Sequence, residues 1–163
     1  PEMLGKVAEP FAAKVMDVSC FLKKVVHADV GRLNVSVTYH DPCHLRFGLG
    51  ITQEPRDLVA AAARFVEMKN ADKCCGMAGS FGILNADLSK KIFAQKAQSV
   101  KESKAQIVAT GCPSCIMQLR GQLRDSGLSV EVVHVIELLR RSLKHQSPRK
   151  EESHGAKHMG TKN

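Results

Sequence analysis

Three features of the sequence predict an α/β fold, with a mostly parallel sheet and flanking helices. Short segments that suit strands recur between longer segments whose apolar residues follow a helical period. Cysteine and proline gather directly after two of the predicted strands, at 40–44 and 110–115, where the sites of α/β proteins form. With 163 residues, 44% of them hydrophobic, the chain has the length of one domain with a real core.

The N-terminal third predicts a helix and then a strand. Apolar residues recur every three or four positions over 4–28, a helical period that Pro10 interrupts. Residues 33–39 alternate between apolar and polar side chains, as a half-buried strand does. Because Pro42 cannot join a sheet ladder, the strand ends before it, and Cys43 lies just beyond the carboxyl end of that strand.

Two helices are expected in the middle of the chain. Pro55 suits a first helical position, and a core-facing apolar stripe predicts a helix from there to about Lys69. Asn85 suits the cap of a second helix that runs to about Lys104. The apolar period of this second helix predicts three inward-facing residues, Leu88, Ile92 and Val100.

The C-terminal part predicts two strands that are each followed by a helix. Residues 106–110 are short and mostly apolar, as expected of a buried parallel strand, and Pro113 opens a helix that ends before Gly127. Residues 128–133 alternate again as a strand, and 135–143 form a last helix. Such alternation of strands and helices favours a parallel sheet with helices on both faces.

Five of the six cysteines fall in three of the predicted loops. They are Cys43, Cys74, Cys75, Cys112 and Cys115. Adjacent cysteines are uncommon because neighbouring side chains normally point in different directions, but a glycine-rich turn after Cys75 allows both thiols to face one site. We expect folding to assemble one site from the three loops.

Three chemistries suit such a site. Thiolates are the usual ligands of iron–sulfur clusters, and a cubane cluster needs four of them. Structural zinc also takes four thiolates, but those sites usually combine two C-x(2–4)-C pairs, whereas this chain has one C-x-x-C. Thiol–disulfide exchange suits the C-P-S-C segment at 112–115, which follows a strand and opens a helix, but it leaves the other three motif cysteines unexplained.

Several neighbouring residues have both a structural and a functional interpretation. Cys20 lies on a predicted helix, where it serves as a small hydrophobic residue or as a sixth ligand. His40 and His44 flank Cys43 as hydrogen-bond partners or metal ligands, and Arg46 and Lys73 are exposed charges or cations beside the site. No acid–base pair suggests catalysis at a substrate carbon, so no catalytic residue is assigned.

The residues around these cysteines resemble the cysteine-rich CCG domain of iron–sulfur oxidoreductase subunits. The resemblance covers about residues 11–143 and is carried by H-D-P-C-H-L at 40–45, C-C-G at 74–76 and C-P-S-C at 112–115. The surrounding residues are most similar to the C-terminal CCG repeat of glycolate oxidase and lactate dehydrogenase iron–sulfur subunits, which are related to a cysteine-rich subunit of heterodisulfide reductase. Many relatives have Asn where this chain has Cys112, so this site keeps a thiol that they lack.

The resemblance implies a cofactor and partners. The five motif cysteines would bind a [4Fe–4S] cluster, either cubane or non-cubane with a bridging cysteine. A partner subunit with FAD would oxidise glycolate or lactate, and electrons would pass through this chain to an acceptor at the membrane surface. The domain would span residues 1–145 and form the C-terminal part of a longer subunit that is a component of an oxidoreductase complex.

Composition bears on the partners and the compartment. The net charge of +8 is spread along helices with no DNA-binding signature, so no nucleic-acid partner is expected. No apolar run approaches the roughly 18 residues that span a bilayer. Clustered cysteines without an export signal favour reduced thiols in the cytoplasm, where the chain would be free or peripheral at the inner face of the membrane. Residues 146–163 are polar and predict a disordered tail.

Overall fold

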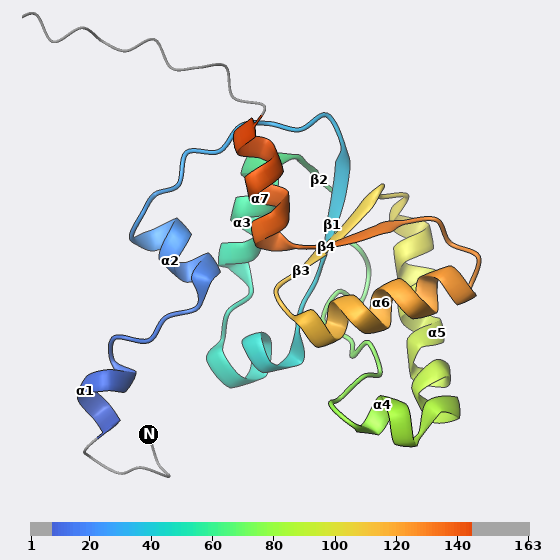
Figure 1. Cartoon of the computed structure of the whole chain (residues 1–163). Coiled ribbons are helices and arrows are strands. Elements are labelled where there is room, and N and C mark those ends of the chain that lie inside the picture. The colour runs from blue at the N-terminus through green and yellow to red at the C-terminus, as the bar shows by residue number, and fades with distance from the viewer. Residues whose placement is uncertain (1–7, 145–163) are drawn as a thin grey trace, which may run out of the picture.

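The computed structural model describes residues 8–144, which form a four-stranded parallel sheet with helices on both faces (Figure 1). The α/β fold class predicted from the sequence is confirmed. The predicted tail at 146–163 lies outside the described residues. Among the described residues, no helix is both long enough and apolar enough to cross a membrane.

The sheet has the strand order β2-β1-β3-β4, and every neighbouring pair runs parallel. The strands are β1 at Ser36–His40, β2 at Arg64–Phe65, β3 at Ile107–Thr110 and β4 at Glu131–His134. The two central strands are completely buried, because helices cover both of their faces.

The connections between the strands decide which face each helix covers. A right-handed crossover from β1 to β2 runs in the opposite direction to the crossovers from β2 to β3 and from β3 to β4. Accordingly, α3 at Gln53–Ala62 and α7 at Val135–Lys144 pack on one face, and α5 at Ala86–Ser103 and α6 at Pro113–Asp125 on the other (Figure 1).

Alternate residues of each strand point into these two layers. Val108 of β3 packs with α5 and α6, whereas Ile107 and Ala109 pack with α3 and α7. The core residue Phe93 of α5 is 1% exposed and belongs to the first layer. The sheet is therefore held by two separate apolar layers.

The prediction of one helix over 4–28 is wrong, because the helical residues of the described part are not continuous. The described part contains two short helices, α1 at Glu9–Ala12 and α2 at Val18–Lys24. The side chain of Asp17 accepts a hydrogen bond of 2.8 Å from the Ser19 N–H, so Asp17 caps a new helix instead of continuing an old one. Phe11, part of the expected apolar stripe, is 74% exposed.

The helix predicted from Pro55 to Lys69 begins two residues earlier and ends sooner. It ends at Ala62, because Ala63 adopts extended backbone angles and leads into β2. Phe65 fitted a helical period but belongs to this two-residue strand, which the sequence pattern did not predict. The prediction also missed a π-helical turn at His44–Gly48 and the short helix α4 at Phe81–Leu84.

Two features of the later elements differ from the prediction. The inward face of α5 is wrong for two residues, since Leu88 is 50% exposed and Ile92 is 37% exposed, while Phe93 and Val100 are buried. The strand predicted over 128–133 is found at Glu131–His134. Pro113 opens α6 as predicted, and Gly127 follows that helix with φ +71°.

Candidate functional site

The candidate site lies where the strand order changes direction. From β1 the chain goes through α3 to β2, and from β3 it goes through α6 to β4, on opposite faces of the sheet. This divergence leaves a crevice outside the carboxyl ends of the two central strands, the usual place for a ligand in an open α/β sheet. Cys43 follows β1 and Cys112 follows β3, so both lie at this crevice.

A cavity of about 140 Å³ occupies the crevice, and all five predicted cysteines line it. The loop with Cys74 and Cys75 reaches the same place from between β2 and α4. His40 and His44 also line the cavity. Folding therefore brings together thiols from three segments that are far apart in the sequence.

The five thiols differ in their access to solvent. Cys75, Cys112 and Cys115 are buried, whereas Cys43 and Cys74 are exposed. The Sγ atoms of Cys75 and Cys115 are 3.5 Å apart and share a hydrogen bond. None of the six cysteines forms a disulfide, so every thiol of the cavity is free to bind a metal.

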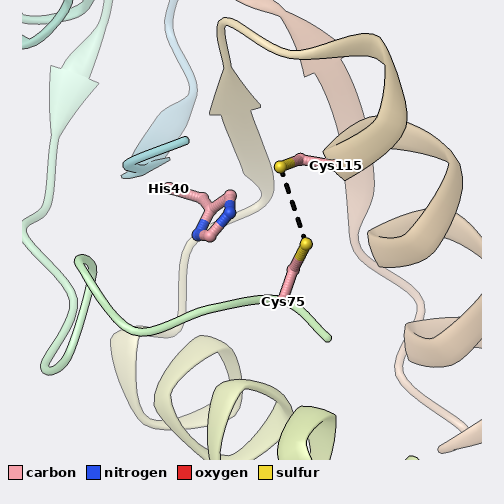
Figure 2. Close-up of side chains that lie close together, drawn as sticks. All are labelled: His40, Cys75 and Cys115. Carbon is pink, nitrogen blue, oxygen red and sulfur yellow. Dashed lines mark hydrogen bonds between the residues drawn. The ribbon is translucent and has the colours of Figure 1, made fainter. Parts of the chain in front are cut away.

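His40 points at the buried pair of thiols (Figure 2). One ligand atom from each of His40, Cys75 and Cys115 lies within 4.8 Å of the others. The His40 side chain is 1% exposed, and neither of its ring nitrogens has a hydrogen-bond partner among the described residues. A buried polar group without a partner is rare in proteins, and here it faces a cavity with room for a bound group.

The electrostatics of the buried pair favour one thiolate. The hydrogen bond shared with Cys115 lowers the pKa of Cys75, and the Met77 N–H lowers it further, against the opposing effect of burial. The same hydrogen bond with Cys75, together with burial, raises the pKa of Cys115. Burial raises the pKa of Cys74, while the Gly76 N–H donates to its sulfur at 3.3 Å and opposes that shift.

The C-C-G turn is fixed by a chain of buried hydrogen bonds. Gln118 of α6 donates to Ser89 Oγ at 2.8 Å, and Ser89 of α5 donates to the carbonyl oxygen of Gly76 at 3.0 Å. Gly76 has φ +87°, and a Cβ atom there would lie 2.8 Å from the Ser89 carbonyl oxygen. The glycine is thus required by both its backbone angle and its close contact with α5.

A second polar network supports the loop that carries Cys43. Asp41 is 1% exposed and accepts two hydrogen bonds from Arg56, at 2.6 and 2.8 Å. Hydrogen bonds to Asp41 and Glu67 raise the pKa of Arg56, whose guanidinium lies over the Tyr39 ring at 5.4 Å. This paired geometry holds the end of β1, next to Cys43, in a fixed position.

The structure separates the other predicted residues from the cavity. Arg46 forms ion pairs with Asp41 at 3.6 Å and Asp72 at 3.7 Å, so its charge is shared with two acids. Lys73 is exposed and does not line the cavity. Cys20 is buried on α2, which packs against α3, and lies beside Glu54, away from the other five cysteines.

The residues that support the cysteine-bearing segments carry no clear signal in the sequence. Ser89, Gln118 and Arg56 are polar residues inside helices, and nothing in their local pattern indicates that they contact these segments. The position of Lys96 does indicate a buried role, because it falls on the buried face of α5 three residues after Phe93. A lysine at such a position calls for a partner, and Lys96 binds the backbone of the loop before Cys74.

The chain is similar to several known proteins, two of which are named as iron–sulfur proteins. It is 34% identical over 150 residues to a probable glycolate oxidase iron-sulfur subunit of Bacillus subtilis, covering 86% of this chain and 34% of the relative. It is 35% identical over 132 residues to lactate utilization protein A of Oceanobacillus iheyensis, covering 78% and 54%. It is 35% identical over 134 residues to an uncharacterized iron-sulfur protein of Methanococcus maripaludis, covering 77% and 27%.

This chain therefore spans between about a quarter and about a half of the length of these relatives. Residues 37–120 match the family of cysteine-rich domains called CCG. The matched range begins in β1 and ends in α6, so it contains all five cysteines of the cavity. With its three cysteine loops at the carboxyl ends of a parallel sheet, the chain belongs to the CCG family of cysteine-rich domains.

Proposed function

We propose that this chain is an electron-transfer domain that binds an iron–sulfur cluster. The observation that carries the proposal is the convergence of five free thiols, from three separate segments of the chain, on one cavity. Thiolates are the preferred ligands of iron–sulfur clusters, and the donor set exceeds the four that a cluster requires. When bound, the cluster would supply one-electron chemistry at the carboxyl edge of the sheet.

The residues around the cavity fit such a group. The cavity of about 140 Å³ is many times the roughly 10–15 Å³ that is enough to hold one water molecule. Cys112 occupies the N-cap position of α6, where unpaired N–H groups and the helix dipole stabilise an anion. The two unpartnered nitrogens of His40 offer a hydrogen-bond donor or a further ligand.

The ligands in this proposal are the five motif cysteines, in a domain of residues 1–145. With five ligands, the [4Fe–4S] cluster would be non-cubane with a bridging cysteine, or cubane with one spare thiol. The adjacent sulfurs of Cys74 and Cys75 suit the bridged form, because one turn presents both to the same cavity.

The wider role in the proposal comes from the relatives. Two of them are named for glycolate oxidase and lactate utilization, so the domain would serve in the oxidation of a 2-hydroxyacid. It would receive electrons from a FAD-containing subunit and pass them to an acceptor at the membrane surface. The chain would then work in the cytoplasm, at the inner face of the membrane, and would not itself act on the substrate carbon.

Structural zinc is the second candidate, because three ligand atoms of His40, Cys75 and Cys115 already lie within 4.8 Å of one another. A tetrahedral zinc ion with sulfur ligands at about 2.3 Å would leave most of the cavity unfilled and two thiols unused. Thiol–disulfide exchange is disfavoured, because it needs an accessible thiolate and both Cys112 and Cys115 are buried.

Metal and sulfide analysis tests the proposal. We expect the full chain, reconstituted without oxygen, to hold about four iron and four sulfide per molecule, with visible absorption that bleaches on reduction. Stoichiometric zinc without sulfide would overturn the proposal in favour of the structural site. Exchange activity with a disulfide substrate, in a chain that retains no metal, would favour the thiol–disulfide function instead.

A further inference from the structure

Lys96 is a buried lysine that is not part of the proposed ligand set. It lies in the middle of α5 on the same face as Phe93 and Val100, and it is 1% exposed. A buried ammonium group is costly unless hydrogen bonds replace its water. Its Nζ atom donates to the carbonyl oxygen of Asn70, and also to that of Ala71 at 3.1 Å.

Both carbonyl groups belong to the segment that leads to the adjacent cysteines. Residues 67–75 form neither helix nor strand, so no regular ladder of backbone hydrogen bonds fixes them. The Ala71 carbonyl also accepts the Asp41 N–H at 3.1 Å. Lys96 thus fastens this segment to α5 at the same carbonyl that ties it to the end of β1, two residues before Cys43.

The ammonium group also acts electrostatically on the cavity. Burial lowers the pKa of Lys96 to about 8, while Asp72, Cys75, Asp41 and Cys74 each act to raise it. The ammonium group lies on the Ala71 carbonyl, three residues before Cys74, so a buried positive charge stands beside the segment that carries the adjacent cysteines, although Lys96 does not line the cavity itself.

We propose that Lys96 is a positioning residue of the cysteine cavity, with two effects. Its hydrogen bonds hold residues 70–75 in the ligand-bearing geometry before any cluster binds. Its positive charge, in a poorly solvated place, then favours the reduced and more negative state of a bound cluster. The second effect rests on the proposed function, whereas the first does not.

Two variants separate the hydrogen bonds from the charge. Lys96→Met keeps much of the side-chain length but removes both the donors and the charge. Lys96→Gln keeps N–H donors without the charge. Lys91→Met on the exposed side of α5 is the control, since it removes one positive charge from the same helix without touching a buried contact.

Hydrogen exchange in the reduced, cluster-free full chain tests the first effect. In Lys96→Met we expect the amides of residues 70–75 to exchange about tenfold faster or more, while those of β1 and β3 keep their protection. Lys96→Gln should lose less protection than Lys96→Met, and Lys91→Met should match the wild type. Unchanged exchange at 70–75 in Lys96→Met would overturn this half of the proposal.

A redox titration of the reconstituted chain tests the second effect. We expect the midpoint potential of Lys96→Met and of Lys96→Gln to be more negative than that of the wild type, with Lys91→Met close to the wild type. If Lys96→Met does not fold, Lys96→Gln decides. Wild-type potential in a Lys96→Gln chain with a full cluster would overturn the charge effect, whereas a wild type that takes up no iron or sulfide would refute the proposed function itself.

Discussion

Replacing Gly76 by alanine tests whether the close approach of the C-C-G turn to α5 is essential. A Cβ atom at this position would lie 2.8 Å from the Ser89 carbonyl oxygen, 3.2 Å from Ser89 Oγ and 3.4 Å from Gln118 Nε2. The first of these atoms belongs to the backbone of α5, and moving it would disturb the hydrogen bonds of that helix. The turn would have to shift, and the hydrogen bonds from Gln118 to Ser89 and from Ser89 to Gly76 would be strained or lost.

The size of the effect follows from two contributions. The positive φ of Gly76 costs an alanine about 1–2 kcal/mol. Loss of a buried hydrogen bond, with its partner left unsatisfied, costs about 1–3 kcal/mol more. We therefore expect Gly76→Ala to lower the free energy of unfolding by about 2–5 kcal/mol. Gly79 is a matched control, because its φ is +62° and a Cβ atom there would meet nothing within 4 Å, so Gly79→Ala should cost only about 1–2 kcal/mol.

Urea denaturation of the reduced, cluster-free chain, followed by circular dichroism, measures both variants. Iron and sulfide analysis after reconstitution gives a second readout, since a displaced turn moves the sulfurs of Cys74 and Cys75. We expect Gly76→Ala to hold less cluster than Gly79→Ala. Equal loss of stability in the two variants would refute the argument from close approach and leave only the backbone angle.

Three further predictions concern the cysteines, the core and the effect of pH. Cys75→Ser should abolish cluster binding, because a hydroxyl is a poor ligand for iron. Cys20→Ser should keep the iron content of the wild type, because Cys20 is buried on α2 away from the cavity. The opposite result in iron analysis would show that the ligands are wrongly assigned. Phe93→Ala should lower the free energy of unfolding by about 3–5 kcal/mol and Leu88→Ala by less than about 1 kcal/mol, because Phe93 is buried and Leu88 is half exposed. Similar values for the two variants in urea denaturation would contradict the assignment of Phe93 to the buried face of α5. The pKa of Lys96 is lowered from 10.5 to about 8, so between these pH values Lys96 binds more protons in the unfolded cluster-free chain than in the folded chain, and this residue alone contributes a rise of stability with pH. That rise should be smaller in Lys96→Met, and identical pH profiles for the two proteins would refute it.

The parts of the fold that the sequence predicted are those with strong local signals. The short apolar segment that ends at Thr110 is typical of a buried parallel strand. Pro113 and Gly127 mark the two ends of α6 by their backbone preferences alone. The five cysteines could be grouped for a similar reason. Two strands that end in cysteine loops in a parallel sheet must present those loops at the same edge.

The parts that were mispredicted depend on tertiary contacts. Phe65 continues the apolar period of α3, but pairing of Val37 with Phe65 in the sheet draws it into β2. In α5, Leu88 and Ile92 suggest one apolar face and Phe93 and Val100 suggest another, so the sequence pattern does not decide which face is buried. The contacts of Ser89 with Gly76 and of Lys96 with Ala71 decide it. A single sequence does not reveal such contacts, because their partners lie about 13 and 25 residues away.

The three-segment origin of the thiols has a consequence for the unfolded chain. A cluster bound by Cys43, the adjacent pair and the C-x-x-C pair would close two successive loops of about 30 and 40 residues. By the loop-closure entropy of a covalent cross-link, each such loop is worth about 4 kcal/mol. Two of them together approach the whole free energy that separates an ordinary folded domain from its unfolded ensemble. A cofactor held in this way would act as a removable cross-link. Oxidative damage that removes it would also restore the conformational entropy of the unfolded chain and so lower the stability of the fold.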